Sequence, residues 1–395
     1  MPSLEATCGR EPGGGELSAP RLRGDTPEKA GLDPAELRHL VREVHDLTTG
    51  ENPWAAGAVV IAGRGPVAAV AEAAGWAVRY ASYDPATDRG VELPSAQRVP
   101  MTLDTPFDVA SLTKLFTAVA AVQQIERGTL GIDARVGAYL PEFRAAAGHG
   151  VTVRQLLTHT SGLRPELPLY DCRDDASRSA MLRAEAPVGV PGTYTYSDLN
   201  PLLLQRVLER ITGRTLDVLV RDGITRPLGM ASTRFGPCPG AAATEDQRRP
   251  WAKADRGMLR GEVHDENAWA LGGVAGHAGL FSTAPDLAVF CRTLLAGGSY
   301  GPARILGPDF VELLLAAPGL GFAVDQPWFM GELAGGGAAG HTGFTGTSLV
   351  LDPATDTFLI LLANTVHPRR RPPTSTPRAA AATRLARAVR AARRA

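Results

Sequence analysis

The stretch that decides the fold reads Phe107-Asp108-Val109-Ala110-Ser111-Leu112-Thr113-Lys114-Leu115-Phe116-Thr117. Its apolar residues predict a buried helix that ends near Arg127-Gly128. Ser111 and Lys114 stand three residues apart, so their side chains share one helical face and can touch. A serine needs a base to act as a nucleophile, and a lysine whose pKa is lowered by burial can be that base. The alternative is an ordinary amphipathic helix that happens to carry a serine and a lysine.

Composition bounds the class of protein. At 395 residues the chain is long enough for two lobes or two domains. Lys+Arg and Asp+Glu are equal at 41 each, which gives no electrostatic case for a nucleic-acid or anionic-membrane partner. The four cysteines show neither metal-ligand spacing nor a disulfide framework. No apolar run indicates a secretory signal or a membrane span, so a cytoplasmic protein is expected.

Strand patterns lie at both ends of the chain, and helical patterns lie between them. A helix over 34–47, capped by Asp33, precedes a β-hairpin over 57–62 and 67–74. A second hairpin is expected over 347–364. The pattern predicts an α+β fold, in which an antiparallel sheet flanked by helices is built from both chain ends and carries an inserted all-helical lobe.

The same pattern gives domain boundaries. Residues 26–368 are expected to form a single domain with an α/β lobe (about 26–128 and 270–368) and a helical lobe (about 129–269). Within the helical lobe, residues 236–261 are polar and contain prolines, so they are expected to be irregular.

The two ends of the chain differ from this domain. Residues 1–25 contain glycines and prolines but little to bury, which predicts a flexible leader. Residues 369–395 are rich in alanine and arginine and are expected to form a basic helix. Such a helix can bind nucleic acid, but we expect its thin apolar stripe to pack on the sheet.

Two further stretches can carry chemistry. Tyr196 lies in Tyr194-Thr195-Tyr196-Ser197-Asp198, at the entrance to a helix; a tyrosine beside a lysine can relay protons. His341-Thr342-Gly343 precedes the late hairpin, where small residues let a substrate approach a strand edge and a free backbone N–H can bind an oxyanion. The alternative for each stretch alone is a structural role: Tyr196 would be a half-buried packing residue, and His341-Thr342-Gly343 would be a tight turn.

Together these three sites resemble the serine β-lactamase and penicillin-binding-protein superfamily, and within it the class C β-lactamase-related branch of esterases, D-aminopeptidases and transacylases. The family pattern is S-x-x-K, then Y-x-N or Y-S-[ND], then [KH]-[TS]-G. The matching elements are Ser111-Leu112-Thr113-Lys114, Tyr196-Ser197-Asp198 and His341-Thr342-Gly343. Stretches 156–163, 227–230 and 276–282 also resemble this branch. The resemblance covers roughly residues 30–367.

The resemblance implies a β-lactamase/transpeptidase-like fold and a role for each matched residue. Ser111 would be the acylated nucleophile, Lys114 would deprotonate it, and Tyr196 would share protons with Lys114 and the leaving group. The backbone N–H groups of Ser111 and Phe344 would form the oxyanion hole. The residues implied to bind substrate are Asp198, His341, Thr342 and Gly343.

Two matched positions depart from the commoner family residues. His341 stands where lysine is frequent; because it is neutral at pH 7, it weakens any fixed cation for a substrate carboxylate and argues against a dedicated β-lactamase. Asp198 stands where many relatives carry asparagine. An ionised aspartate only accepts hydrogen bonds, so it suits an amine or hydroxyl donor better than an amide carbonyl.

The remaining polar candidates are assigned structural roles. The stretch His264-Asp265-Glu266-Asn267 fits no usual ligand set and is expected to shape the cleft. His159 and His277 are expected to satisfy backbone groups. Residues 335–340 match G-x-G-x-x-G but lack the βαβ context of a nucleotide site, and no G-x-S-x-G elbow is present. No cofactor and no metal are implied.

These observations predict a serine hydrolase that acts through an acyl-enzyme on a small-molecule ester or amide, in the manner of an esterase or peptidase. Three alternatives stay open: a transacylase that moves the acyl group to an amine or alcohol, a β-lactamase or penicillin-binding protein, and a non-catalytic sensor of the same fold. Neither a nucleic-acid nor a membrane partner is expected, and the pattern does not fix the oligomeric state.

Overall fold

An eight-stranded sheet forms the centre of the computed structural model, which describes residues 19–372 and 374–392. The strand order is β1-β3-β2-β17-β16-β15-β14, and β6 joins at β3. The β1–β3 pair is parallel and the other pairs are antiparallel. The strands are β1 (Arg23–Gly24), β2 (Gly57–Arg64), β3 (Val67–Val78), β6 (Val99–Pro100), β14 (Ala323–Val324), β15 (Ala339–Thr342), β16 (Ser348–Asp352) and β17 (Thr357–Ala363).

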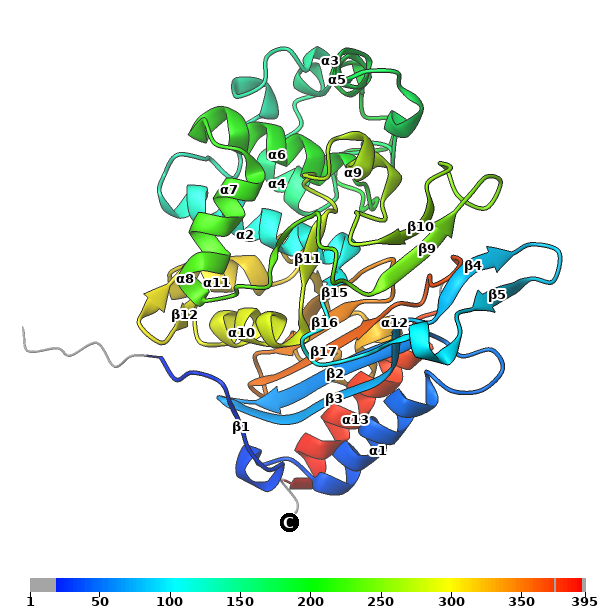
Figure 1. Ribbon diagram of the computed structural model, residues 1–395. Helices are drawn as coiled ribbons and strands as arrows, with labels where there is room; N and C mark the ends of the chain where they lie inside the picture. Colours follow the sequence, from blue (N-terminus) through cyan, green and yellow to red (C-terminus); the bar gives the residue numbers. More distant parts are fainter. Residues whose placement is uncertain (1–18, 373, 393–395) are drawn as a thin grey trace, which may run out of the picture.

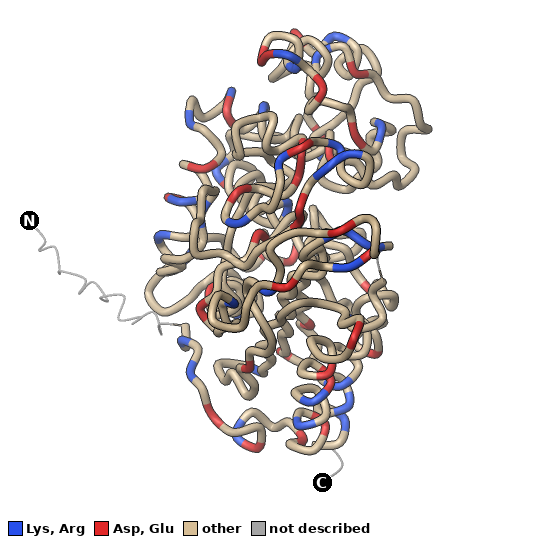
Figure 2. Tube along the Cα trace, turned by 45° about the vertical axis from the view of Figure 1, so that its right-hand side comes forward, with Lys and Arg blue, Asp and Glu red and all other residues tan. Residues whose placement is uncertain are grey.

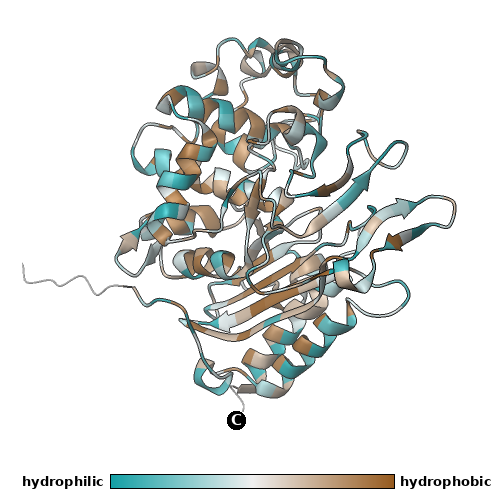
Figure 3. Cartoon of the chain, in the orientation of Figure 1, coloured by the Kyte–Doolittle hydropathy of each residue, from teal (hydrophilic) through white to brown (hydrophobic). Residues whose placement is uncertain are grey.

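The middle of this sheet joins the two ends of the chain. β17 pairs with β2 from Thr357–Arg64 to Ala363–Ala58, and all seven residues of β17 are buried. Apolar residues dominate these strands, much of which is brown in Figure 3, and nearly all of their residues are buried. A strand of this composition must be covered on both sides, which requires a helical layer on each face of the sheet.

One face carries α1 (Pro34–Asp46) and α13 (Thr376–Ala392), at the bottom of Figure 1. Asp33 caps α1 by accepting hydrogen bonds from the backbone N–H groups of Ala35 (2.6 Å) and Glu36 (3.3 Å). α13 buries an alanine-rich stripe with Leu385 and Val389 against α1 and the sheet. Beside it lies the short helix α12 (Pro327–Met330).

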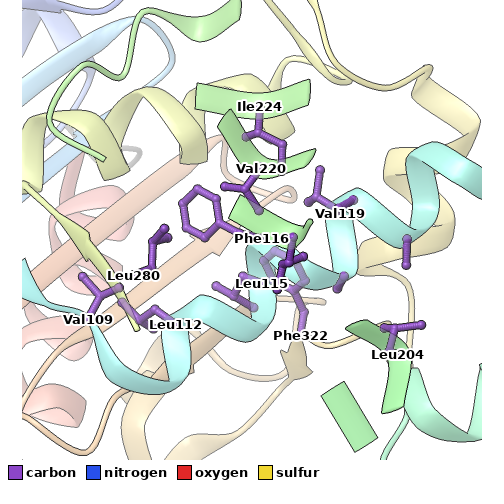
Figure 4. Packing of buried hydrophobic residues seen from close by; sticks show 14 of the residues in the cluster. Val109, Leu112, Leu115, Phe116, Val119, Leu204, Val220, Ile224, Leu280 and Phe322 are labelled. Carbon is purple, nitrogen blue, oxygen red and sulfur yellow. The ribbon is translucent and has the colours of Figure 1, made fainter. Parts of the chain in front are cut away.

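The other face carries α2 (Thr113–Glu126), α10 (Ala284–Leu295) and α11 (Pro308–Leu315). Twelve of the fourteen residues of α2 are buried, so this helix runs through the main core. Figure 4 shows Leu115, Phe116 and Val119 of α2 among side chains from several other elements. Phe116 stacks on Phe290 of α10 with ring centroids 4.5 Å apart. The core therefore fixes the helix that begins two residues after Ser111.

The segment between the two halves of the sheet is mainly helical and lies at the top of Figure 1. Its helices are α3 (Arg144–Gly148), α4 (Val153–Leu157), α5 (Asp175–Ala184), α6 (Leu199–Thr212), α7 (Leu216–Val220), α8 (Arg226–Leu228) and α9 (Glu266–Ala270). The smaller strands, from this segment and elsewhere, are β4 (Tyr80–Asp84), β5 (Arg89–Glu92), β7 (Phe107–Asp108), β8 (Arg234–Phe235), β9 (Ala243–Gln247), β10 (Gly257–Arg260), β11 (Leu280–Ser282), β12 (Ser299–Tyr300) and β13 (Ala303–Arg304).

The structure confirms the predicted α+β fold class and corrects one segment. Residues 236–261 are not irregular throughout, because they contain the antiparallel hairpin of β9 and β10. All five residues of β9 are buried although three of them are charged or amide side chains. Their polarity suggested a loop, but it is accommodated by a buried ion network described below. Of the predicted leader, residues 1–18 lie outside the described residues, and residues 23–24 form β1.

Charges of both signs are interspersed along the described chain (Figure 2). At the foot of the molecule, Arg384 of α13 pairs with Glu36 and Glu43 of α1 at 3.1 and 2.6 Å. Such exposed or half-exposed pairs contribute little stability individually. Among the described residues, no helix is both long and apolar enough to cross a bilayer.

Candidate active site

Ser111 lies in the 3-10 turn η3 (Ala110–Leu112), immediately before α2. Ala110 has a φ of 47°, a backbone conformation that residues with a side chain rarely adopt. The buried Asp108 side chain accepts a hydrogen bond from the Ala110 backbone N–H at 2.8 Å and another from the His264 backbone N–H at 2.6 Å. Asp108 therefore holds the turn that presents the serine.

The three predicted catalytic side chains meet at the Ser111 hydroxyl. The Lys114 ammonium nitrogen lies 2.7 Å from Ser111 Oγ, and the Tyr196 hydroxyl lies 3.0 Å from the same oxygen. Tyr196 precedes α6, so residues 85 positions apart in the chain share one contact. A nucleophile within hydrogen-bond reach of two proton-carrying groups is the geometry that acyl transfer requires.

The charge of Lys114 differs from the expectation. Burial disfavours its ammonium, but the Asp198 carboxylate 2.8 Å away and the Tyr196 hydroxyl together outweigh burial, and the pKa of Lys114 is raised above its ordinary value. The expectation that burial lowers this pKa is therefore wrong. Lys114 also donates a hydrogen bond to the His277 carbonyl at 3.2 Å. In the resting protein Lys114 is a protonated donor to Ser111.

Tyr196 is held by stacking. The His159 ring stacks on it with centroids 4.8 Å apart and planes inclined by 26°, and the Lys114 ammonium lies 5.0 Å from the Tyr196 ring centre. Burial of the hydroxyl raises the pKa of Tyr196 despite the nearby Lys114, so the phenol is protonated at neutral pH. His159 Nδ1 accepts a hydrogen bond from the Ser197 backbone N–H at 3.1 Å, which agrees with its predicted structural role. Burial lowers the pKa of His159 to about 3.

The predicted strand edge lies beside Ser111. Thr345 and Thr347 donate side-chain hydrogen bonds to the carbonyls of Asp108 (2.7 Å) and Val109 (3.0 Å), which tie the loop after β15 to the serine turn. The close approach requires Gly343, because a Cβ there would lie 2.5 Å from the Val109 carbonyl oxygen.

His341 of β15 faces the same pocket without a charge. Its Nδ1 lies 2.7 Å from the Thr342 carbonyl oxygen. Burial, followed by the nearby Lys114, lowers the pKa of His341 to about 4. The imidazole is neutral at pH 7 and offers no cation to a substrate.

Asp198 contacts Lys114 and also approaches two residues that the sequence did not single out for catalysis. Asp198, Asp265 and His277 place one ligand-type atom each within 4.8 Å of one another. Asp265 pairs with His277 Nε2 at 2.9 Å, so His277 contacts a carboxylate and not the predicted backbone group. A metal ion here would lie beside the Lys114 ammonium, which already supplies positive charge, so we assign none. We name Ser111, Lys114, Tyr196, Asp198, Asp265 and His277 the active-site network.

A second polar cluster lies next to it, and we name it the Glu245 network: Glu245, His264, Glu266 and Arg370. Fully buried Glu245 contacts His264 Nε2 at 2.8 Å and Arg370 at 2.7 Å. Burial opposes its charge, yet these two partners lower the pKa of Glu245 to about 2. Arg370 also reaches Glu266 at 2.5 Å. The predicted cleft-shaping stretch is thus divided between the two networks, with Asp265 in one and its neighbours in the other.

Members of both networks line one pocket of about 960 Å³. Three lysine or arginine residues line it, namely Lys253, Arg370 and Arg378. Lys253 pairs with Glu166 at 2.5 Å and Arg370 pairs with two glutamates. Arg378 of α13 has no carboxylate partner among the residues that the structure describes. Its guanidinium donates to the Gly343 carbonyl at 3.0 Å, and burial lowers its pKa to about 10, so it remains charged.

Arg378 was missed because the sequence carries no signal for it. It lies 37 positions after His341 and reads as one arginine of a basic helix. Asp265 could have been noticed as the N-cap of α9, since its side chain accepts from the Ala268 backbone N–H at 2.7 Å. Only the fold shows that the same side chain faces His277.

Comparison with known proteins identifies the family. A family model described as Beta-lactamase matches residues 49–384, and the chain belongs to this family of serine hydrolases. A relative from Escherichia coli (strain K12), provisionally named a D-alanyl-D-alanine carboxypeptidase, is 33% identical over 312 residues, covering 69% of this chain and 71% of that protein. The N-acetylmuramyl-L-alanine amidase of Bacillus subtilis (strain 168) is 32% identical over 302 residues, covering 67% of this chain and 68% of that protein.

A solved structure shares the fold. The structure of EstCE1, described as a hydrolase with promiscuous acyltransferase activity, superposes with a TM-score of 0.68 over 89% of this chain and 99% of that one. The sequence identity is 22%, so this likeness supports the β-lactamase/transpeptidase-like fold and no particular substrate.

Proposed function

We propose that this protein hydrolyses a small amide or ester through an acyl-enzyme formed on Ser111. The observation that carries the proposal is the pair of contacts at the Ser111 hydroxyl, 2.7 Å to Lys114 and 3.0 Å to Tyr196. Ser111 Oγ attacks the carbonyl carbon, and the backbone N–H groups of Ser111 and Phe344 bind the oxyanion. Tyr196 and Lys114 pass a proton to the leaving group, and water then releases the acyl group.

Amides of alanine are the favoured substrates. The two relatives are named for D-alanyl-D-alanine and N-acetylmuramyl-L-alanine bonds, and in both the leaving amine belongs to alanine. The presence of Arg378 favours a substrate whose leaving group has a free carboxylate. Arg378 is a buried cation in the pocket, and no carboxylate among the described residues pairs with it. It restores at another position the positive charge that His341 does not provide.

A substrate panel tests this proposal. It contains p-nitrophenyl esters, a peptide ending in D-alanyl-D-alanine, N-acetylmuramyl-L-alanine and a chromogenic cephalosporin, each incubated with wild type and Ser111→Ala. Release of alanine or p-nitrophenol by wild type, lost in the variant, is expected. Cephalosporin turnover far above the other substrates would favour the β-lactamase alternative, and equal rates in the two proteins would exclude Ser111 as the nucleophile.

A further inference from the structure

Asp198 completes a continuous line of contacts that begins at the nucleophile. Ser111 Oγ lies 2.7 Å from Lys114 Nζ, which lies 2.8 Å from Asp198 Oδ1. Among the described residues this buried carboxylate oxygen has no aligned hydrogen-bond donor, so the lysine is its one close partner. The line therefore ends on an oxygen that can take up a proton.

A proton acceptor is needed beyond Lys114. The pKa of Lys114 is raised, so its amine is already protonated, and burial keeps the hydroxyl of Tyr196 protonated as well. Neither group can accept the proton of Ser111 until it has lost one of its own. The only contact through which Lys114 can lose a proton within the network is the one to Asp198.

The surroundings of Asp198 are compatible with this. The titratable groups that face it are Lys114 of α2, Tyr196 of its own loop, His159 after α4, Asp265 at the start of α9, His277 before β11 and His341 of β15. Two of the histidines are uncharged at neutral pH. Asp265 is ionised and repels a second carboxylate so close to it, and this repulsion falls when Asp198 becomes protonated.

We propose that Asp198 is a relay residue that stores the proton of Lys114 while Ser111 is acylated. As Ser111 Oγ bonds to the carbonyl carbon, its proton moves to Lys114 Nζ, and one Lys114 proton moves to Asp198 Oδ1. When the bond to the leaving group breaks, both transfers reverse and the proton reaches the departing amine or alkoxide. No proton is gained or lost overall, and no further reactant is required.

This role differs from substrate binding, which the family resemblance implies for this position. Asparagine, which many relatives carry here, can hold a lysine or a substrate by hydrogen bonds, but its amide does not take up a proton under these conditions. The substitution Asp198→Asn therefore separates the two roles. It removes the acceptor and leaves a hydrogen-bonding group of nearly the same shape.

The test measures the rate at which a fluorophosphonate labels Ser111, between pH 5 and pH 9. Labelling forms the Oγ–P bond and releases fluoride without protonation, so its pH dependence reports the removal of the serine proton. In Asp198→Asn, Lys114 must itself be neutral to act. We expect the labelling rate at pH 6 to fall about 100-fold, with the deficit shrinking about tenfold per pH unit as the pH rises.

Conservative and matched variants keep the result decisive. Asp198→Glu retains a carboxylate, so its labelling should keep the acid side of the wild-type profile even if the rate is lower at every pH. Asp133→Asn removes an exposed carboxylate that pairs with Arg154 at 2.6 Å and should leave the profile unchanged. A uniform loss at every pH in Asp198→Asn, or an unchanged rate, would overturn the proposal. Because the inference rests on the proposed function, wild type is first compared with Ser111→Ala; equal labelling of those two would instead refute the nucleophile.

Discussion

The active-site network and the Glu245 network lie along one pocket and differ in how completely their groups are paired. Among the described residues, no fully buried side-chain nitrogen or oxygen of the Glu245 network lacks a hydrogen-bond partner. In the active-site network, His277 Nδ1 has no hydrogen-bond partner in the described chain, and the one close partner of Asp198 Oδ1 there is the Lys114 ammonium, 2.8 Å away. A fully paired buried network stabilises one arrangement, whereas an incompletely paired one retains oxygen and nitrogen atoms that can exchange protons.

The two networks meet at consecutive residues, Asp265 and Glu266. Asp265 contacts His277 and approaches Asp198, whereas Glu266 contacts Arg370. Neighbouring acidic residues at the start of one short helix thus have different partners. In the sequence the two residues look alike, because both are acidic and they are adjacent. Only their contacts in the fold place one beside Ser111 and Lys114 and the other in the Glu245 network.

The largest expected effect comes from the active-site network. Lys114→Met removes the group that contacts both Ser111 and Asp198, so kcat/KM for a p-nitrophenyl ester should fall about 1000-fold. The folded state should persist, because the new side chain is apolar and lies in the main core. Lys29→Met, at an exposed lysine of the structure's first turn, is the control. A loss below about tenfold would show that Lys114 does not carry protons in the reaction.

In the Glu245 network the expected effect is on stability. Arg370→Met leaves the fully buried Glu245 carboxylate with His264 and the backbone N–H of residue 370 as its remaining partners, and the free energy of unfolding should fall by about 3 kcal/mol. Denaturant titration measures it, and Ser111 labelling by a fluorophosphonate should fall far less than in Lys114→Met. If labelling fell as strongly as it does in Lys114→Met, the two networks would have to be regarded as one.

The sequence predicts the active-site network better than it predicts the Glu245 network. The order of the three motifs predicts that Ser111, Lys114 and Tyr196 lie together. In the structure the Lys114 nitrogen and the Tyr196 hydroxyl lie 2.7 and 3.0 Å from Ser111 Oγ. It did not predict the charge of Lys114, because that charge depends on Asp198, 84 positions later. Motif spacing specifies which residues meet and leaves their protonation to the folded environment.

The polar strand β9 illustrates the opposite case. Its sequence, Ala-Thr-Glu-Asp-Gln, indicates a loop, because Glu245 and Asp246 are rarely buried unless they are paired. Arg370 supplies the partner from 125 positions away, and no local pattern announces it. By contrast, α1 and the β2–β3 hairpin were predictable because their caps, turns and apolar faces are all local.

A third effect is expected at His367, whose Nδ1 contacts the Thr244 carbonyl next to the Glu245 network. Its Nε2 accepts from the backbone N–H groups of Arg79 and Tyr80, both at 3.1 Å, and burial lowers its pKa from 6.5 to about 4. Between these pH values the unfolded chain binds a proton that the folded protein excludes, so stability falls as the pH drops from 6.5 to 4. His367→Asn should reduce the loss between pH 7.5 and pH 5 by about 2 kcal/mol.

Urea titrations at the two pH values measure this effect. His39→Asn is the control, because His39 is exposed on α1 and contacts Arg42. The same slope in wild type and His367→Asn would mean that other groups, such as His341 in the active site, account for the acid sensitivity.

The smallest expected effect distinguishes the two arginines of the pocket. Arg370 is held by two glutamates, whereas Arg378 is 7% exposed and lacks a described carboxylate partner, so only Arg378 is free to bind a substrate anion. Arg378→Gln should raise KM about tenfold for a peptide with a free C-terminal carboxylate and leave KM nearly unchanged for the same peptide as a C-terminal amide. Arg387→Gln, on the same helix but paired with Glu332 at 2.7 Å, controls for the loss of a charge. An equal change in KM for both peptides would show that Arg378 does not bind the substrate carboxylate. Its role would then be to hold the Gly343 backbone through the 3.0 Å hydrogen bond.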